Sequence, residues 1–138
     1  MIMATNLPGF ENYPICDKLA DRFNLPTFID NDANVAGLAE ALLGAGKGKP
    51  TCYYVTISTG IGGAFVVNGQ LVSGGRGHAG EVGNIIVKNN GYKFGGLNPG
   101  AVEGEASGTA ITRKGKEILG EDRVNHAGDV FRLADEGD

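Results

Sequence analysis

The sequence has few of the residues that mark secreted or membrane proteins. Among 138 residues there is no tryptophan and there are two cysteines, Cys16 and Cys52. Two cysteines make neither a disulfide framework nor a zinc site, and we expect both to be reduced, buried thiols. No stretch approaches the roughly 20 apolar residues of a membrane span, and the first residues do not resemble a signal peptide. These absences favour a cytoplasmic protein without a membrane partner.

The sequence also lacks a large excess of charge of either sign. Lysine and arginine number 12 against 16 for aspartate and glutamate, which gives a net charge of −4. No basic run occurs, so we expect no nucleic-acid partner. Glycine, in contrast, occupies 24 positions. Because the glycines alternate with apolar, strand-like runs, they predict tight turns and backbone-lined ligand loops and not disorder.

The stretch at residues 28–40 organises the rest of the chain. The end of an expected strand at 27–29 leads into Asp30, Asn31 and Asp32, and a helix is predicted from there to about residue 43. Aspartate and asparagine are common helix caps, so capping is one interpretation of this elbow. The other is a carboxylate base, Asp32, with Asn31 beside it to bind a polyol. These three polar residues by themselves leave both interpretations open.

A three-stranded antiparallel meander is predicted next. β-Branched and aromatic residues predict strands at 51–58, 64–67 and 70–73. Asn68-Gly69 predicts a type I′ hairpin turn, because both central residues of that turn need a positive φ. The glycine-rich linker at 44–50 predicts a domain boundary after residue 46, with a loop inside one domain as the alternative.

The other elements are predicted from periodicity and turn chemistry. Residues 1–14 have turn chemistry, and a fourth strand is expected at 85–88. Helices are expected at 12–23, 102–119 and 128–134. The fold class that results is α/β.

The turn at residues 58–63 reads Ser-Thr-Gly-Ile-Gly-Gly. Successive glycine amides can form a nest that binds a phosphate, and the Thr59 hydroxyl adds a donor. The motif lacks the lysine and the following helix of a P-loop, and a strand follows it where a Rossmann fingerprint has a helix. A glycine-rich hairpin without a ligand is the simpler interpretation of this motif taken alone.

Glu81 and Glu103 are further candidate binding residues. Glu81 lies in a glycine-rich loop and could accept hydrogen bonds from sugar hydroxyls, although most glutamates are simply solvated. Glu103 lies in the first turn of an expected helix, where the helix dipole favours an acid regardless of function. His78 has no second histidine or cysteine at ligand spacing, so no metal site is predicted. Asp32 and these acids together supply the base and the positioning that phosphoryl transfer needs.

These motifs occur in one order along the chain: Asp30-Asn31-Asp32-Ala33-Asn34, Glu40, Gly44-Ala45-Gly46-Lys47-Gly48, Ser58-Thr59-Gly60-Ile61-Gly62-Gly63, Asn68-Gly69, Ala79-Gly80-Glu81-Val82-Gly83, Glu103 and Ala106-Ser107-Gly108. In this order and spacing they resemble the ROK family of bacterial sugar kinases and sugar-responsive repressors. The resemblance implies a two-lobed, actin-like fold of the hexokinase type (RNase H-like), with sugar and ATP between the lobes. Residues 1–46 would hold the end of the amino-terminal lobe and the interlobe helix, and residues 47–138 the first half of the carboxyl-terminal lobe.

The resemblance also implies roles for single residues. Asp32 matches the catalytic base that takes the proton of the attacking sugar hydroxyl. The matching sugar-binding residues are Asn31, Glu81 and Glu103. The matching phosphate-contacting turn includes Thr59, Gly60, Gly62 and Gly63. The cofactors would be ATP and Mg²⁺.

Two departures from the family pattern concern zinc. Many members carry a histidine three residues after the match to Glu81, where this chain has Asn84, which could still reach the sugar. The loop that follows often holds zinc-binding cysteines, whereas residues 92–101 contain none. We therefore expect no structural zinc.

The resemblance predicts the central part of a kinase of about twice this length, inactive by itself. The phosphate-binding hairpin of the family would precede the matched region, and the adenosine site would follow it. The reaction would be phosphorylation of a hydroxyl of a hexose or N-acetylhexosamine, in a homodimer. Two alternatives stay open: the sugar-sensing region of a repressor of the same family, which would need a helix-turn-helix before this region, and an inert sugar-binding remnant.

Overall fold

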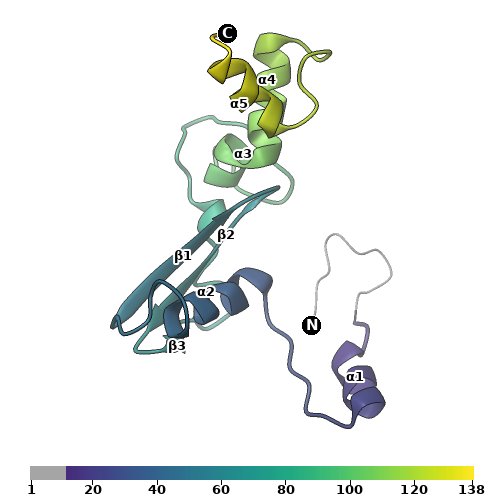
Figure 1. Cartoon of the computed structure of the whole chain (residues 1–138), viewed down its shortest axis with the longest axis vertical. Coiled ribbons are helices and arrows are strands. Elements are labelled where there is room, and N and C mark those ends of the chain that lie inside the picture. Colours follow the sequence, from purple (N-terminus) through teal and green to yellow (C-terminus); the bar gives the residue numbers. More distant parts are fainter. Residues whose placement is uncertain (1–11) are drawn as a thin grey trace. The chain divides into compact units, whose positions relative to one another are not determined.

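The computed structural model describes residues 12–138, so most of the turn-rich stretch predicted at 1–14 lies outside the described residues. The chain divides into two compact units, residues 1–31 and residues 32–138. Figure 1 gives the order of the helices and strands along the chain. The candidate residues from Asp32 onward all belong to the second unit.

The described part of the first unit is one helix and an extended segment. α1 (Ile15–Phe23) ends at Asn24, whose φ of 52° is the left-handed conformation common after a helix. The helix starts later than predicted, because Asn12 has a φ of 57°, which a right-handed helix does not allow. The strand predicted at 27–29 is wrong. No strand in the described part of this unit pairs with it, and Phe28 is 90% exposed.

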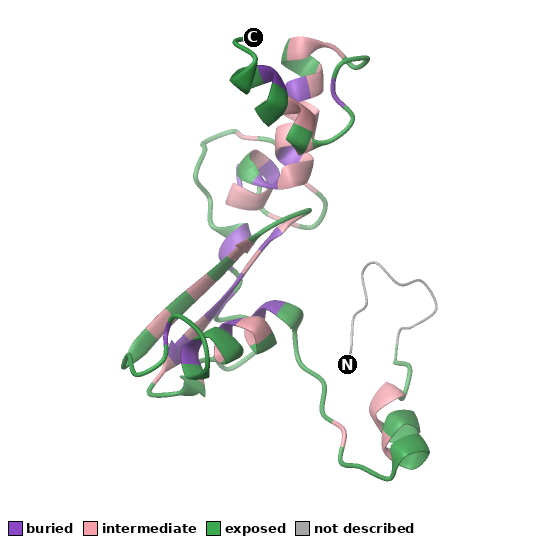
Figure 2. Ribbon diagram, viewed as in Figure 1, coloured by how far each residue is buried: buried purple, intermediate pink, exposed green. Residues whose placement is uncertain are grey.

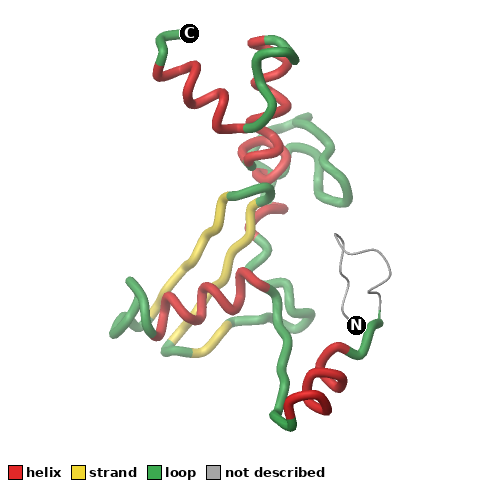
Figure 3. The backbone as a smooth tube through the Cα atoms, turned by 45° about the vertical axis from the view of Figure 1, so that its right-hand side comes forward, coloured by secondary structure: helices red, strands yellow, loops and turns green. Residues whose placement is uncertain are grey.

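The second unit is built on a three-stranded antiparallel sheet, which confirms the predicted meander (Figure 3). Its strands are β1 (Thr51–Ile57), β2 (Ile61–Val67) and β3 (Gln70–Leu71), in the order β1-β2-β3. The β2–β3 turn has a φ of 49° at Asn68 and 76° at Gly69, as a type I′ turn requires. β2 begins earlier than predicted and β3 is shorter, so the β1–β2 hairpin forms most of the sheet.

α2 (Asp32–Leu42) covers one face of this sheet. Its buried residues are Ala33, Gly37 and Ala41, which recur every four residues and so form one stripe. Only small residues fit this stripe, because a Cβ built on Gly37 would stand 2.5 Å from the Cβ of Ala64, a fully buried β2 residue. Figure 2 shows the buried contact in purple along α2 and β2. Gly37, the smallest residue of this stripe, therefore sets the distance between α2 and the sheet.

The other face of β1 is largely exposed. Exposed and half-buried residues alternate along this strand, and Tyr53, Val55 and Ile57 are on the exposed side. The Tyr53 ring packs edge-on against that of Phe65, with 5.8 Å between the ring centres, and Tyr53 as a whole is still 53% exposed. Among the described residues β2 is the only strand that pairs with β1. β1 is thus an apolar edge strand.

After β3 the chain forms a loop and then the short 3-10 helix η1 (Val82–Asn84). The strand predicted at 85–88 is wrong, because a single bridge forms there, between Ile86 and Ala101. The amides of residues 87 and 88 both donate to the Gly100 carbonyl, at 2.9 and 3.2 Å. Two donors that share one acceptor cannot continue a strand ladder, so the pairing ends after one bridge.

The helix predicted at 102–119 is two helices, α3 (Val102–Ala106) and α4 (Gly108–Leu119). The break lies at Ser107, whose ψ of 166° is extended. The buried Ser107 hydroxyl accepts a hydrogen bond of 3.2 Å from the Ala110 N–H and so caps α4. The last helix, α5 (Ala127–Asp135), lies where it was predicted and packs against α4.

The two thiols are free, as expected. Cys16 and Cys52 are each half-buried, however, where full burial was expected. Within residues 12–138 no helix is both long enough and apolar enough to cross a membrane.

Replacing Gly37 by alanine is expected to destabilise the fold. The added methyl group needs the space of the Ala64 Cβ, so α2 has to move away from the sheet, at a cost of about 1–3 kcal/mol for overpacking. The better helix propensity of alanine offsets about 1 kcal/mol of this. Urea unfolding followed by circular dichroism measures the net loss in the free energy of unfolding.

Two further variants test the cause of this loss. Gly37→Ala with Ala64→Gly removes the closest contact of the added methyl group, and it is expected to regain part of the lost stability because a contact of 3.0 Å with the Tyr54 Cβ remains. Gly75→Ala is the matched control, because a Cβ built on Gly75 meets no atom within 4 Å. A Gly37→Ala variant that is more stable than the wild type by about 1 kcal/mol, the full gain in helix propensity, would show that α2 does not pack this closely on the sheet.

Candidate functional site

Asp32 is the first residue of α2, and it is exposed. Its Oδ1 atom accepts a hydrogen bond of 2.9 Å from the Ala33 N–H. The Oδ1 atom of Asp30 likewise accepts a hydrogen bond of 2.7 Å from the Asn31 N–H. Local capping therefore accounts for one oxygen of each aspartate, and a ligand proton would go to the Oδ2 atom of Asp32.

Ala33 fixes this end of α2 on β2. Its Cβ stands 3.1 Å from the point where Gly62 would carry a Cβ. On the other face of the strand, a Cβ on Gly63 would stand 3.1 Å from the Gly80 carbonyl oxygen. Gly62 and Gly63 thus lie inside β2 and not in the turn. Close packing on both faces is a sufficient reason for these glycines, and their contact with a phosphate stays a prediction.

The turn between β1 and β2 is fixed on the N-terminus of α4. The Ser58 carbonyl accepts a hydrogen bond of 2.8 Å from the Gly108 N–H. The Thr59 carbonyl accepts one of 2.8 Å from the Thr109 hydroxyl and one of 3.4 Å from its N–H. Within the turn, the Ser58 N–H donates to the Gly60 carbonyl at 2.9 Å. The turn carbonyls thus satisfy helix amides that would otherwise need another acceptor.

Glu103 reaches the same turn from α3. Its Oε2 atom accepts a hydrogen bond of 2.7 Å from the Ile61 N–H. The same oxygen lies 3.2 Å from the point where Gly83, in η1, would carry a Cβ. The turn, α3 and η1 therefore meet at one half-buried carboxylate. Because Oε2 is bound to the backbone, a ligand would be bound through Oε1.

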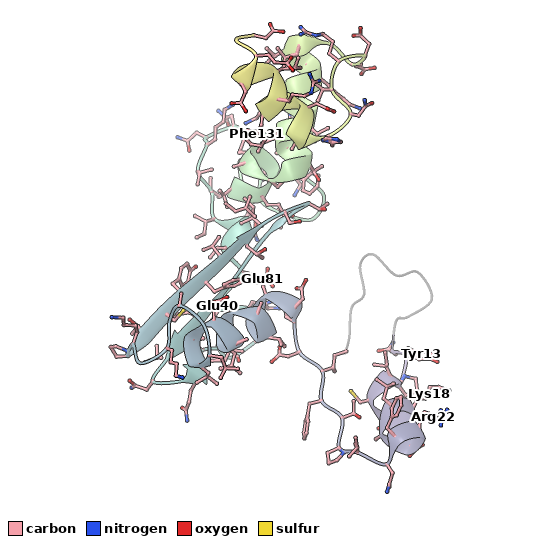
Figure 4. The ribbon with its side chains drawn as sticks, viewed as in Figure 1. Tyr13, Lys18, Arg22, Glu40, Glu81 and Phe131 are labelled. Atoms are coloured by element: carbon pink, nitrogen blue, oxygen red, sulfur yellow. The ribbon has the colours of Figure 1, made fainter. Side chains whose placement is uncertain are left out.

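Glu81 immediately precedes η1, and 55% of its side chain is exposed (Figure 4). The His78 Nδ1 lies 4.0 Å from its Oε1, which makes an ion pair when the histidine is protonated. The backbone beside it is tightly packed, because a Cβ on Gly80 would stand 2.4 Å from the Gly63 carbonyl oxygen. Glu81 is therefore an exposed carboxylate on a tightly packed backbone segment, which suits a ligand-binding residue.

Asn84 ends η1 and connects it to the loop that follows. Its Oδ1 atom accepts a hydrogen bond of 2.7 Å from the Asn98 N–H. Its side-chain nitrogen would be the group that donates to a sugar oxygen. The position of Asn84 thus depends on residues 88–100, the loop that leads into α3.

The contacts of the candidate residues converge on Ile61 and Gly62, the first residues of β2. They come from the first turn of α2, from α3 and from η1 with the residues before it. The predicted residues gathered in this way are Asp32, Thr59, Gly60, Gly62, Gly63, Glu81, Asn84 and Glu103. Asn31, the last residue of the first unit, directly precedes Asp32 in the chain. The backbone segments that carry these carboxylates, the amide and the hydroxyl therefore meet at one end of β2, and side chains of this kind suit a polyhydroxylated ligand.

The sequence analysis missed Glu105, an enclosed acid next to this cluster. Only 7% of its side chain is exposed. Its Oε2 atom lies 2.7 Å from the Lys114 Nζ, and its Oε1 atom accepts a hydrogen bond of 2.8 Å from the Tyr92 N–H. The hydrogen bond from Lys114, and then that from Tyr92, hold the pKa of Glu105 below its ordinary value of 4.5. The one sequence signal is a second acid just after Glu103, which looks like another acid favoured by the helix dipole.

The residues near this loop do not fit a zinc ion. Within residues 12–138, no three histidine, cysteine, aspartate or glutamate side chains are grouped to hold a metal. The Asn84 oxygen is bonded to the Asn98 N–H, and the Glu105 carboxylate is paired with Lys114 and Lys88. Two ammonium groups beside the enclosed Glu105 carboxylate would repel a divalent cation, and none of the contacts described for this loop brings a thiolate or an imidazole to it.

The sequence matches the ROK family over residues 1–138. The glucokinase of Halalkalibacterium halodurans is 36% identical over 94% of this chain and 43% of that protein. The N-acetylmannosamine kinase of Yersinia pestis is 37% identical over 96% of this chain and 44% of that protein. The chain therefore spans less than half of the length of these curated relatives.

Solved structures with the same fold include ROK proteins. A ROK hexokinase from Thermus thermophilus has a TM-score of 0.87 at 38% identity, over 96% of this chain and 44% of that one. A ROK glucokinase from Streptomyces griseus, solved with glucose and AMPPNP, has a TM-score of 0.71 at 31% identity, over 91% and 45%. A ROK transcriptional regulator, a homologue of the E. coli MLC protein, has a TM-score of 0.74 at 26% identity, over 90% and 33%.

These likenesses agree with the α/β architecture and with part of the actin-like kinase fold. They extend over nearly the whole of this chain, and they include kinases as well as a regulator. The match over residues 1–138 establishes that the chain belongs to the ROK family.

Proposed function

We propose that this chain is the central part of an ATP-dependent sugar kinase that phosphorylates a hexose or an N-acetylhexosamine. The observation that carries the proposal is the convergence of an exposed aspartate, two glutamates and a glycine turn at the start of β2 in a ROK protein. Relatives named glucokinase and N-acetylmannosamine kinase support both sugar classes. The identity of the sugar is left open between them.

Asp32 is the general base in this proposal. The hydrogen bond between Oδ1 and the Ala33 N–H orients the carboxylate, and Oδ2 takes the proton of the sugar hydroxyl as the γ-phosphoryl group passes to the hydroxyl oxygen. The sugar is held by Asn31, Glu81, Asn84 and Glu103. Each of these offers hydrogen bonds to hydroxyl groups.

The phosphates of ATP contact Thr59 and Gly60 in the β1–β2 turn and Gly62 and Gly63 at the start of β2. The Ser58 and Ile61 amides donate to protein oxygens, so a phosphate oxygen would use the amides between them, those of Thr59 and Gly60. A Cβ on Gly60 would stand 2.7 Å from the Glu103 Oε2, so this turn lies beside a negative charge. Mg²⁺ bound with ATP would supply the positive charge that compensates for it.

The lobe assignment follows from the same proposal. Residues 1–46 are the end of the amino-terminal lobe with the interlobe helix, and residues 47–138 are the first half of the carboxyl-terminal lobe. The boundary between the two compact units, after Asn31, describes contacts within this chain and is not the boundary between the proposed lobes. We also propose that the complete protein is a cytoplasmic homodimer, inactive when reduced to these residues.

A sugar-sensing role is the second candidate function. The ROK regulator with a TM-score of 0.74 supports it, because the same fold serves a regulator there. The curated relatives at 36–37% identity are named as kinases, and the family resemblance matches Asp32 to a catalytic base, so the kinase is the stronger proposal. An inert sugar-binding remnant is the third, and the measurements below separate them.

The codons that flank these residues are expected to encode the rest of a kinase. The intact mass of the native protein should then be about twice that of this chain, because the chain covers 43–44% of its kinase relatives. Mass spectrometry of the native protein and sequencing of the locus test this. An upstream helix-turn-helix would favour the regulator, and a start and a stop codon with nothing kinase-like outside would withdraw the enzyme assignment.

Asp32→Asn in the complete kinase is expected to lower kcat about 10²- to 10⁴-fold, the usual contribution of a general base. Sugar affinity, measured by titration calorimetry, should stay close to that of the wild type, because the amide keeps the shape and the cap. Asp135→Asn in α5 is the control for the same chemical change at a remote site. Lost sugar binding with turnover retained would contradict the assignment of Asp32.

The chain by itself is expected to bind the sugar weakly. A ligand that binds only the folded state, at about 100 times its Kd, adds about 2.7 kcal/mol to the free energy of unfolding. Scanning fluorimetry with glucose and N-acetylmannosamine measures this as a rise in Tm. Glu81→Gln should reduce the rise and Glu136→Gln should not. No rise with any sugar would refute sugar binding by this chain.

A further inference from the structure

We propose that Glu105 is a positioning residue: its carboxylate locks the loop of residues 88–100 against α3 and α4, and this sets the position of Asn84. The link to the sugar rests on the proposed function. The lock itself does not, because it consists of contacts within the chain and can be measured without a ligand.

The Glu105 carboxylate binds the loop and α4 at the same time. Its Oε1 atom accepts from the Tyr92 N–H at 2.8 Å, and its Oε2 atom lies 2.7 Å from the Lys114 Nζ and 3.9 Å from the Lys88 Nζ. Lys114 also donates to the Glu105 carbonyl at 2.8 Å. Hydrogen bonds to charged groups are roughly twice as strong as neutral ones. An enclosed carboxylate therefore joins three segments that are separate in sequence.

The loop is shaped around this carboxylate. A Cβ on Gly91 would stand 2.5 Å from the Glu105 Oε1 and 2.5 Å from the Gly100 Cα. The backbone at Gly91 thus comes as close to the side chain as a residue without a Cβ permits. Such a close fit is expected of a fixed contact and not of a solvated surface ion pair.

Arg113 holds the same loop through the aromatic ring of Tyr92. The guanidinium lies over the Tyr92 ring, 3.9 Å from its centre, and donates to the Gly104 carbonyl at 3.2 Å. Glu117 pairs with Arg113 at 2.9 Å from the solvent side. Tyr92 is therefore bound by its N–H to α3 and by its ring to α4.

One hydrogen bond closes the locked loop, and a second connects it to the candidate site. The Gly100 N–H donates to the Tyr92 carbonyl at 3.0 Å, and the Asn98 N–H donates to the Asn84 Oδ1 at 2.7 Å. Asn84 follows Gly83, which lies against Glu103. The position of the Asn84 amide therefore depends on the loop, and the loop depends on Glu105.

The lock requires the negative charge of Glu105. The charged groups that face it are Lys88 in the loop and Lys114 on α4, both cationic. Its pKa is held below 4.5 by the Lys114 and Tyr92 hydrogen bonds, so the lock is complete above pH 4.5 and is lost as the pH falls through the lowered pKa. Acid should therefore open the loop before the β1–β2 hairpin.

Hydrogen exchange of the chain tests the lock directly. In Glu105→Gln the amides of residues 88–101 are expected to exchange about 10- to 100-fold faster, the range set by one hydrogen bond to a charged group. Exchange in β1 and β2 should be unchanged. Glu136→Gln is the matched control, because it removes an equal charge from an exposed pair with Arg132 in α5. Unchanged exchange at residues 88–101 in Glu105→Gln would overturn the proposal.

The wild type provides a second test if Glu105→Gln does not fold. Its loop exchange, corrected for the intrinsic pH dependence, should rise below pH 4.5 while that of β2 does not. Equal behaviour of the loop and β2 across this range would also overturn the lock. Addition of a metal chelator at neutral pH should leave the loop exchange unchanged, and an increase would assign the role to a bound metal instead.

Sugar titrations separate this inference from the proposed function. Glu105→Gln, which removes no sugar contact, should weaken sugar binding at least fivefold. An opened loop with unchanged sugar affinity would overturn the positioning role. A wild type that binds no sugar, but whose loop opens in Glu105→Gln, would refute the proposed function of this chain and leave the lock established.

Discussion

The hydrogen bonds between the β1–β2 turn and the first residues of α4 connect the sheet to the helices that follow it. They exist because the chain breaks its helix at Ser107. A continuous helix would use the amides of Gly108 and Thr109 within its own ladder, whereas a new helix that begins at Gly108 leaves them unpaired. The carbonyls of Ser58 and Thr59 then accept them.

The same break places the acids of α3. Glu103 and Glu105 lie in a helix of five residues that ends before α4 begins, so they point to different neighbours than they would in one long helix. Glu103 binds the backbone at the start of β2, and Glu105 binds the backbone of the preceding loop. The candidate site and the loop beside it are thus both held by carboxylates that accept main-chain hydrogen bonds.

Sequence reasoning succeeded where structure is local. The meander and its type I′ turn depend on neighbouring residues, and Asn68-Gly69 specifies the turn by itself. It failed at 85–88, where apolar residues have strand propensity but Gly100 takes two amides, and at 27–29, where an extended segment has no partner among the described residues. The helix predicted at 102–119 is interrupted where the Ser107 hydroxyl caps α4 and the Gly108 N–H donates to the Ser58 carbonyl, a contact between segments far apart in sequence.

The sequence predicted which residues form the candidate site, but it did not predict the contacts that hold them in place. Asp32, Glu81 and Glu103 stand out in sequence because polar residues follow apolar or glycine-rich runs. Glu105 could not be found, because its partners Lys114 and Tyr92 are nine and 13 residues away and meet it only when the loop is folded. Its neighbours in sequence are small residues, which give no sign of an ion pair.

The edge strand β1 has a consequence for handling the chain by itself. Tyr53, Val55 and Ile57 lie on an open face, and among the described residues the outer backbone groups of β1 have no partner strand. An apolar edge of this kind is a template on which another β-strand can add. Self-association at this edge would follow mass action, so dilution, low temperature or a charged fusion partner decides whether preparations remain monodisperse.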